Sequence, residues 1–313
     1  MFTYTCKRLL MTIPVLLFVA VFMFGLVVFT PGDPAAVLAG EGATAQDIAQ
    51  IHAALGLNQS VVLRFGEWLW AVLHGDLGRS MFTHIPVMQM VIRHATPTVT
   101  LMVMTMLVSV LIAVPVGVLA AWYHNRWPDH SVMIFAVFMF SVPAFVVGYL
   151  LAWVFGLQLR WFPVQGYVPF SRGVLLSLRS LVLPAITLGS VYVALIARIT
   201  RATLLDTLRE DYIRTARSKG VGGWSLLFHH ALKNAANPIV TVIGLGVALL
   251  IGGTVVTETV FSIPGLGRMI VDAILQHDYP VIQGTILLFS FAYVLINLAV
   301  DLLYRVFDPR IKY

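Results

Sequence analysis

Long apolar segments recur along the chain and are separated by stretches that hold most of its charged and turn-forming residues. A helix needs about 20 residues to cross a hydrocarbon core roughly 30 Å thick. Six segments meet this requirement and predict six transmembrane helices, at 9–29, 99–122, 132–155, 181–197, 239–257 and 284–304. The pattern therefore predicts an all-α polytopic membrane protein.

The composition leads to the same fold class. Of the 313 residues, 59% are hydrophobic and only 11% are charged, which is more apolar surface than a soluble domain buries. The first apolar segment is longer than the roughly 7 to 15 apolar residues of a cleavable signal peptide, so we expect it to be retained as a transmembrane helix. Cys6 is the only cysteine, which excludes an intrachain disulfide.

The distribution of Lys and Arg predicts the orientation, because cytoplasmic loops retain positive charge during insertion. With the N-terminus inside, most of the 20 basic residues lie in inner segments, and the outer segments hold Arg64, Arg79, Arg93, Arg160, Arg172, Arg179 and Arg268. Both termini are therefore expected in the cytoplasm. Membrane topology also accounts for the net charge of +6, without any binding of nucleic acid.

The segment 31–98 is the longest stretch outside the predicted spans, and it contains two predicted helices. Thr44 is a candidate N-cap for a helix over 45–55, which Gly56 would end. A second helix is predicted over 59–74, where apolar residues recur every three or four positions. This apolar stripe would lie on the membrane interface or against other helices, and we favour packing against the permease core.

A charged stretch from Glu210 to Pro238 interrupts the apolar pattern between the fourth and fifth spans. Gly220 lies within it and predicts a break between two short helices, since glycine commonly ends a helix. So many charges beside the membrane favour a docking site for another protein. Contact with anionic lipid would suit the basic residues equally well.

This stretch resembles the signature cytoplasmic loop, often called the EAA loop, of bacterial ABC importer permeases. In that loop an alanine lies four residues before a fixed glycine, as Ala216 lies before Gly220. Arg214 replaces the first residue of the motif, which is typical of the peptide-importer branch. Further stretches similar to that branch lie at 31–34, 55–57, 75–78, 257–261, 264–267, 278–281, 297–304 and 308–310.

The resemblance is to the first of two permease types in the dipeptide, oligopeptide, glutathione and nickel importers (dipeptide permease B-like). It implies a type I ABC importer (MetI-like) permease fold. Residues 1–30 would hold the N-terminal tail and helix 1, residues 31–98 an extracytoplasmic helical region, and residues 99–313 the permease core with a coupling loop at 201–237.

The resemblance also implies an assembly in the bacterial inner membrane. The chain would form a heterodimer with a second homologous permease and join two ABC ATPase subunits and an extracytoplasmic solute-binding protein. ATP and Mg would be used by the ATPase subunits. The chain itself has no Gly-Lys dipeptide and therefore no P-loop, which agrees with a partner that binds the nucleotide.

Contact with the ATPase subunits would be made by the loop around Gly220. Two short helices at an angle can fit a groove and transmit displacement. The predicted contact residues are Arg214, Ala216, Arg217, Lys219, Gly220, Val221, Trp224 and Phe228.

In the fifth span, Gly244, Ala248 and Gly252 recur at every fourth position and allow close helix contact. The contact lies either with the second permease or within the same chain. Candidates for the translocation path or gate are Thr254, Thr257, Glu258, Asn297 and Asp301.

Ionisable residues near membrane helices usually have partners, because an unpaired charge is costly there. We expect Asp301 to pair with Arg198 or Arg201, mainly in a structural role. Glu258 would meet a cationic solute or the binding protein, or would be a solvated carboxylate at the interface. Thr254 and Thr257 would contact solute or bond to their own backbone.

Catalytic and metal chemistry are not expected. His74, His84 and His94 are evenly spaced, but ten residues is not a whole number of helical turns and glycine and proline interrupt the stretch. Ser141, Ser190 and Ser290 have no evident His or Asp partner at the same membrane depth. We predict a non-catalytic permease subunit without a cofactor of its own.

The predicted function is import of dipeptides or short peptides by alternating access. The same machine importing glutathione or a nickel or other metal chelate is the main alternative. A secondary transporter working without ATPase partners is the remote one, because it would need a coupling-ion site and an internal repeat, neither of which is evident.

Overall fold

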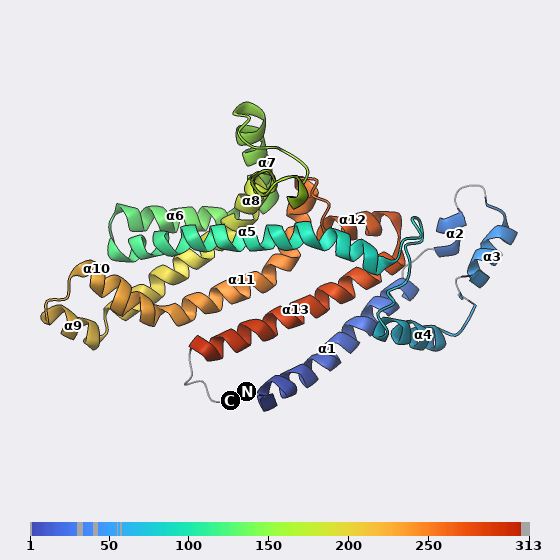
Figure 1. Cartoon of the computed structure of the whole chain (residues 1–313), viewed down its shortest axis with the longest axis horizontal. Coiled ribbons are helices and arrows are strands. Elements are labelled where there is room, and N and C mark those ends of the chain that lie inside the picture. Colours follow the sequence, from blue (N-terminus) through green and yellow to red (C-terminus); the bar gives the residue numbers. More distant parts are fainter. Residues whose placement is uncertain (1, 30–33, 40–42, 55, 57, 308–313) are drawn as a thin grey trace. The chain divides into compact units, whose positions relative to one another are not determined.

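The computed structural model describes residues 2–29, 34–39, 43–54, 56 and 58–307. Every regular element in this part of the chain is helical. The elements, shown in Figure 1, are α1 (Phe2–Phe29), α2 (Pro34–Ala39), α3 (Ala45–Ala54), α4 (Val61–Leu73), α5 (Val87–Trp122), α6 (Trp127–Ser141), α7 (Ala144–Leu151), η1 (Ala152–Gln158), η2 (Phe170–Arg172), α8 (Val174–Leu208), α9 (Asp211–Ser218), α10 (Gly223–Ser225), η3 (Leu226–Ala231), α11 (Leu232–Val260), α12 (Leu266–Gln276) and α13 (Tyr279–Phe307).

The helices long and apolar enough to cross a membrane agree with the predicted all-α membrane fold. Five such helices lie among the described residues, at Leu10–Phe29, Val87–Trp122, Val174–Leu208, Gly223–Val260 and Tyr279–Val300. A sixth span is possible only if α6 and α7 with η1 count as one.

The third predicted span, 132–155, is not one straight helix. The chain bends by 104° between α6 and α7. Val142 has extended backbone (ψ 123°) and precedes Pro143, whose ring disfavours the helical conformation of the residue before it. Pro115 and Pro184, by contrast, lie within α5 and α8 without ending them.

The described chain forms two compact units. The first comprises Met1–Thr96 with Gly265–Leu295, and the second comprises Pro97–Pro264 with Ile296–Tyr313. The region predicted to lie outside the membrane, 31–98, thus belongs almost entirely to the first unit, with α1, α12 and most of α13.

Short polar contacts build the first unit. Thr44 and Asp47 cap α3 reciprocally, since the Asp47 amide donates to Thr44 Oγ1 (3.3 Å) and the Thr44 amide to Asp47 Oδ2 (3.0 Å). The Thr44 hydroxyl also donates to Asp47 Oδ2 (2.7 Å), and this bond, with that of the Thr44 amide, lowers the pKa of Asp47. Elsewhere in the unit, Ser80 and the backbone of Met81 donate to buried Asp278 (2.5 and 3.2 Å), which ties the 74–86 turn to the start of α13.

The apolar stripe of α4 packs partly against α1. Phe24 contacts Phe65 and Trp68, with ring centroids 5.3 and 5.6 Å apart, and Arg64 lies over the Phe24 ring. This part of the stripe therefore packs against another helix, α1, which lies outside the predicted permease core. Val62 and Leu73 remain exposed on the rest of it.

In the second unit, α8 is the most buried of the long helices and packs against α6, α7 and α11. Two points of close approach join α8 to α5. Ser109 Oγ donates to the Gly189 carbonyl (3.3 Å), and a Cβ at Gly117 would lie 2.6 Å from the Ala197 carbonyl oxygen. The eight-residue spacing is the same on both helices, so α5 and α8 run parallel and touch at small residues.

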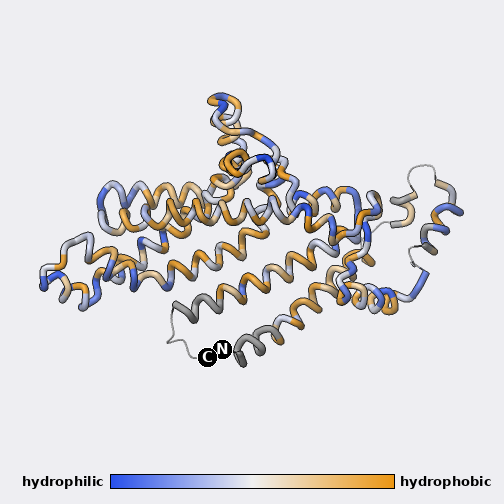
Figure 2. Tube along the Cα trace, in the orientation of Figure 1, coloured by the Kyte–Doolittle hydropathy of each residue, from blue (hydrophilic) through white to orange (hydrophobic). Residues whose placement is uncertain are grey.

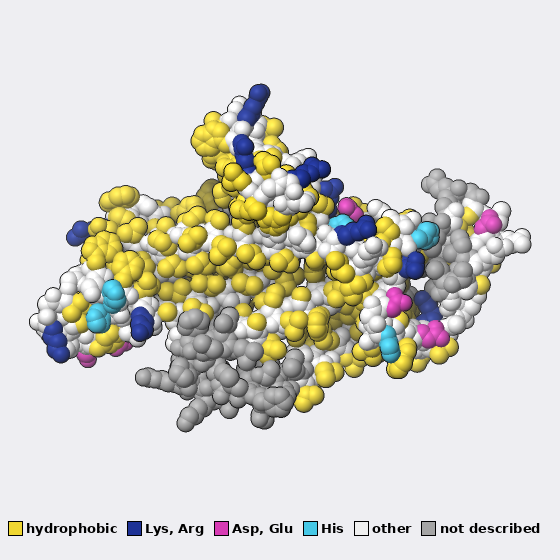
Figure 3. Space-filling view, in the orientation of Figure 1, with side chains coloured by type: hydrophobic (Ala, Val, Ile, Leu, Met, Phe, Trp, Pro, Cys, Tyr) yellow, Lys and Arg dark blue, Asp and Glu magenta, His cyan; other side chains and the backbone are white. Residues whose placement is uncertain are grey.

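The exposed surface of the second unit is mainly apolar. Hydrophobic residues follow its long helices and hydrophilic ones gather around α9 in Figure 2, and Figure 3 shows yellow side chains over α5 and α6. Exposed side chains such as Leu111, Ile134 and Phe138 would be costly in water. They fit a helix bundle surrounded by lipid.

Candidate functional site

The charged stretch after α8 folds into a helix, a tight turn and a second helix. α8 continues to Leu208, so the first residues of the predicted loop 201–237 are still helical. After α9 and a turn at Gly220, a new helix begins at Gly223 and continues without interruption to Val260. The predicted second short helix is thus the start of the membrane-crossing helix itself, and movement at the turn would act directly on that helix.

The turn that ends α9 explains the spacing of Ala216 and Gly220. The Val221 amide donates to the Ala216 carbonyl (3.2 Å) and the Gly220 amide to the Arg217 carbonyl (3.0 Å). These two bonds make a Schellman motif, in which the residue after the cap has positive φ. Gly220 has φ 81°, which favours glycine, and the motif places Val221 beside Ala216.

Buried side chains beneath the turn hold it to the helix bundle. Ile213 from α9 and Leu226 and Leu227 from η3 are almost fully buried, and they pack with Leu204 of α8 and Val118 of α5. Asn234 Nδ2 also donates to the Tyr212 hydroxyl (2.9 Å), which joins α9 to α11. The segment is therefore a rigid part of the second unit rather than a loose loop.

The opposite side of the segment is exposed and basic. Arg217 and Lys219 are exposed, and among the described residues Arg214 pairs with exposed Asp211 (3.4 Å). Such a surface pair contributes little to stability. These charges are free to meet a partner.

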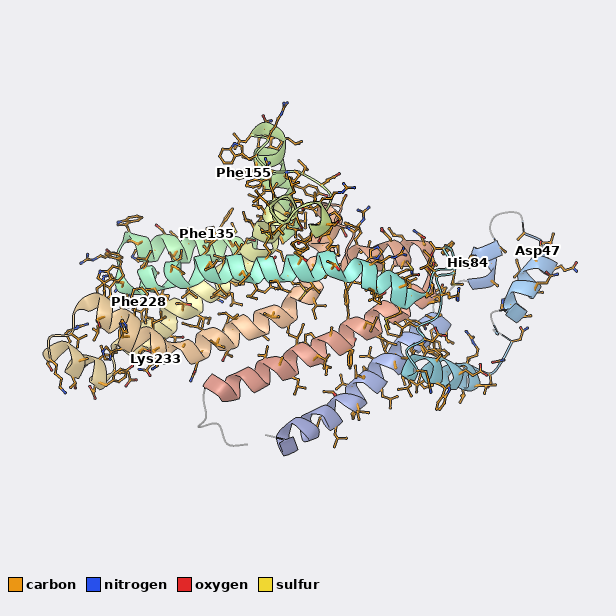
Figure 4. The ribbon with its side chains drawn as sticks, viewed as in Figure 1. Asp47, His84, Phe135, Phe155, Phe228 and Lys233 are labelled. Carbon is orange, nitrogen blue, oxygen red and sulfur yellow. The ribbon has the colours of Figure 1, made fainter. Side chains whose placement is uncertain are left out.

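An aromatic stack lies beside these charges. Trp122 at the end of α5, Trp224 and Phe228 have ring centroids 6.1 and 5.8 Å apart. Trp224 is 60% exposed and Phe228 47% exposed, and Figure 4 shows Phe228 at this end of the unit with Lys233 nearby. Gly223 allows the stack, because a Cβ there would lie 2.9 Å from the Trp122 ring. Exposed aromatic rings next to arginines are typical of the centre of a protein interface.

A buried ion pair at the same end of the second unit was not predicted from the sequence. Asp129 is 1% exposed and accepts from Nε and Nη2 of Arg201, with Nη2–Oδ2 at 2.7 Å. The Asn125 amide also donates to it (2.9 Å), and His124 lies at 3.2 Å. This carboxylate connects the turn between α5 and α6 with Arg201 of α8. Arg201 lies about two helical turns before the charged segment.

The predicted pairing of Asp301 involves a side chain outside the described residues. Of its two proposed partners, Arg201 is bonded to Asp129, and Arg198 lies over the Phe140 ring at 4.9 Å. Asn297, one turn before Asp301, lies on α13 and is half-buried. The role of these residues in the path stays a prediction.

The predicted small-residue face of α11 is only partly used within the chain. Ala248 is buried, whereas a Cβ at Gly252 would meet nothing within 4 Å. The close contacts within the chain are made instead at Gly246, against Met106 and Tyr192, and at Gly253. Gly244 is half-buried, so the open part of this face lies around Gly252.

The polar residues at the end of α11 point inward. Thr254 and Thr257 are buried and bond to the carbonyls of Ile251 and Gly253, as one of the two expectations stated. Glu258 is fully buried and accepts from the Thr98 hydroxyl (2.6 Å). It is therefore not the solvated interfacial carboxylate considered from sequence.

Metal ligation gains no support from the geometry. Within the described ranges, no three His, Cys, Asp or Glu side chains are grouped so as to hold an ion. His74 and His94 each bond through Nδ1 to a carbonyl one helical turn earlier, at Trp70 and Met90.

The Gly220 turn gives a graded prediction. A Cβ at Gly220 would meet nothing within 4 Å, so a substitution there is opposed only by the positive φ. We expect Gly220→Asn to be tolerated best and Gly220→Val worst. Gly220→Ala should lower the free energy of local unfolding of α9 and its turn by about 1 to 2 kcal/mol. Hydrogen exchange of the α9 amides would measure this loss.

Gly222→Ala is the matched control. Gly222 is equally open but has ordinary backbone (φ −63°, ψ 150°), so alanine should change exchange little. Equal exchange in Gly220→Ala and Gly222→Ala would contradict the role of the positive φ.

Comparison with known proteins gives the same family over the whole chain. The profile described as "Binding-protein-dependent transport system inner membrane component" matches residues 113–313, and the corresponding N-terminal profile matches residues 1–113. A chain of the MetNI methionine ABC transporter, in an inward-facing form, has a similar fold, with a TM-score of 0.58 at 18% identity over 71% of this chain and 97% of that one.

Relatives match from end to end. A probable peptide ABC transporter permease of Sinorhizobium fredii is 50% identical, with 99% of each chain covered. A putative peptide transport system permease of Brucella abortus is 44% identical over 98% of each chain, and a glutathione transport system permease of Salmonella choleraesuis is 44% identical over 100% of each. The chain thus belongs to the inner membrane components of binding-protein-dependent transport systems.

Proposed function

We propose that this chain forms half of the translocation path of an ABC importer for dipeptides or short peptides. The observation that carries the proposal is the exposed aromatic and basic surface of the 209–228 segment, which rests on a buried core and continues into α11. A surface of this kind can receive force from a partner and pass it to a membrane helix. The named peptide permeases among the relatives favour a peptide as the solute.

The proposed complex contains a second, homologous permease, two ATPase subunits that use ATP and Mg, and an extracytoplasmic solute-binding protein. This chain would bind no nucleotide and catalyse no reaction. Both termini and the 209–228 segment would face the cytoplasm of the cell. The open face of α11 around Gly252 is the proposed contact with the second permease, because a Cβ at Gly252 would meet no described residue within 4 Å.

Phe228→Ala tests the docking surface, by which we mean the aromatic stack of Trp122, Trp224 and Phe228 together with the exposed Arg214, Arg217 and Lys219. We expect it to lower co-purification of the ATPase subunits and uptake at least tenfold, because an aromatic side chain at an interface centre often contributes 2 kcal/mol or more. Phe135→Ala is the matched control. The two rings are similarly exposed, at 47% and 45%, but Phe135 lies on α6 away from the segment (Figure 4).

Three results would contradict the proposal or narrow it. Undiminished ATPase binding in Phe228→Ala would argue against docking at this surface. Transport by the chain without ATPase partners would favour a secondary transporter. Uptake of labelled glutathione rather than dipeptide by the intact complex would favour the alternative solute, which the 44% identity to a glutathione permease keeps open.

A further inference from the structure

The chain from η1 to the first turns of α8 concentrates positive charge without acidic residues. Arg160, Arg172 and Arg179 lie within 20 positions, and no Asp or Glu occurs from residue 130 to residue 205. This segment lies at the start of α8, and the charged 209–228 segment follows that helix. Since 35 helical residues extend about 50 Å, the two lie on opposite sides of a bilayer. Arginine is usually depleted on the side away from the cytoplasm, so this cluster requires an explanation.

Two of these arginines line one cavity. Its volume is about 450 Å³, and η1, the following loop and α8 form its walls. The other lining side chains are mainly apolar, among them Phe162, Val164 and Leu176. A ligand that fits must therefore offer both negative charge and apolar surface.

The arginine side chains are left available for an anion. Arg179 donates from Nε and Nη2 to the Trp161 carbonyl (3.2 and 2.7 Å), which fixes its guanidinium, while Nη1 has no hydrogen-bond partner among the described residues. Arg160 is exposed, and its side chain has no hydrogen-bond or ion-pair partner in the part of the chain that the structure describes. Two cations thus border one cavity with no carboxylate between them.

The surroundings of the cavity suit lipid rather than water. Leu175 is 80% exposed, Trp161 55% and Trp153 54%, and the Trp161 ring also contacts Phe155 (5.6 Å). Figure 3 shows basic side chains among apolar ones on the segment that carries α7, and Figure 4 marks Phe155 there. Tryptophan and arginine together are typical of the headgroup level of a membrane.

We propose that this cavity binds the headgroup of an anionic phospholipid. The phosphate lies between Arg160 and Arg179, and the acyl chains lie along the apolar wall near Leu176. The bound lipid would neutralise the arginine cluster and hold the bent α6–α7 segment at the membrane surface. The inference does not depend on which solute is transported.

Native mass spectrometry of the transporter purified from its membranes tests this directly, with phosphatidylglycerol as the probe and phosphatidylcholine as its zwitterionic counterpart. Arg160→Gln and Arg179→Gln should each lower the retained phosphatidylglycerol about fivefold, since one cation near an anionic lipid contributes about that factor. Arg160→Lys should retain it, because the charge is kept.

Arg172→Gln is the matched control, since Arg172 is exposed in the same segment but does not line the cavity. Its phosphatidylglycerol retention should equal that of the parent. The proposal is overturned if Arg172→Gln loses as much lipid as the other two, or if none of the variants loses any. Equal retention of phosphatidylcholine, or displacement of the lipid by inorganic phosphate, would also overturn it.

Discussion

Replacing Asp129 by asparagine is expected to destabilise the second unit by about 3 kcal/mol. The substitution leaves Arg201 without its buried counter-charge, and breaking such a pair typically costs about 3 to 5 kcal/mol. We expect the lower end, because the Arg201 side chain keeps 18% of its surface exposed and can recruit water. Thermal unfolding in detergent should show a midpoint lowered by roughly 6 to 12 °C.

Asp206→Asn supplies the control for this change. Asp206 lies on the same helix, α8, but is exposed, so its replacement should shift the midpoint by about a degree at most. A double variant, Asp129→Leu with Arg201→Met, should be more stable than Asp129→Asn, because two apolar side chains leave no buried charge unpaired. Equal midpoints for Asp129→Asn and Asp206→Asn would contradict the proposed role of the pair.

The position of this ion pair also explains why Asp129→Asn should lower assembly with the ATPase subunits and transport. Asp129 fixes the turn between α5 and α6 to α8, and Trp122, at the end of α5, is the first ring of the aromatic stack that continues to Trp224 and Phe228. A loosened turn would move one end of the docking surface. The pair is thus a positioning element for that surface as well as a source of stability.

The sequence predicted the membrane helices well, because segment length and hydrophobicity depend on local composition alone. It also predicted the turn at Gly220, since glycine takes the positive φ found there more readily than other residues. The bend at Pro143 was not predicted, because Pro115 and Pro184 give the same local signal within continuous helices. Neighbouring packing, which the pattern does not record, decides between a kinked helix and a broken one.

Contacts between distant residues were beyond the sequence analysis for the same reason. Asp129 and Arg201 are 72 positions apart, and nothing local distinguishes Asp129 from an exposed helix-starting aspartate. A solvated interfacial carboxylate was one expectation for Glu258, but the side chain is fully buried and accepts from Thr98, which is 160 positions away. A single acidic residue near apolar segments was the available signal, and it indicates only that some partner must exist.

The close packing of α5 and α8 gives the second strong prediction, at Gly117. A Cβ there would lie 2.6 Å from the Ala197 carbonyl oxygen and 2.7 Å from Thr200 Cβ, and the carbonyl cannot move without shifting α8. Gly117→Ala should therefore destabilise the second unit by about 1 to 3 kcal/mol, the usual cost of overpacking, and Gly117→Val should cost more. The unfolding midpoint and the yield of folded protein would measure the loss.

Gly252→Ala tests whether crowding, rather than the loss of a glycine, causes this effect. Gly252 lies on a membrane helix of the same unit, and a Cβ there meets nothing within 4 Å of the chain. Alanine should leave the midpoint of the isolated chain unchanged or slightly raised, since alanine favours the helical state over glycine. If Gly117→Ala behaves in the same way, α5 and α8 do not approach each other at this point. If only Gly117→Ala unfolds early, the contact at Ala197 sets how closely the two parallel helices can pack, and with it the position of Trp122 beneath the docking surface.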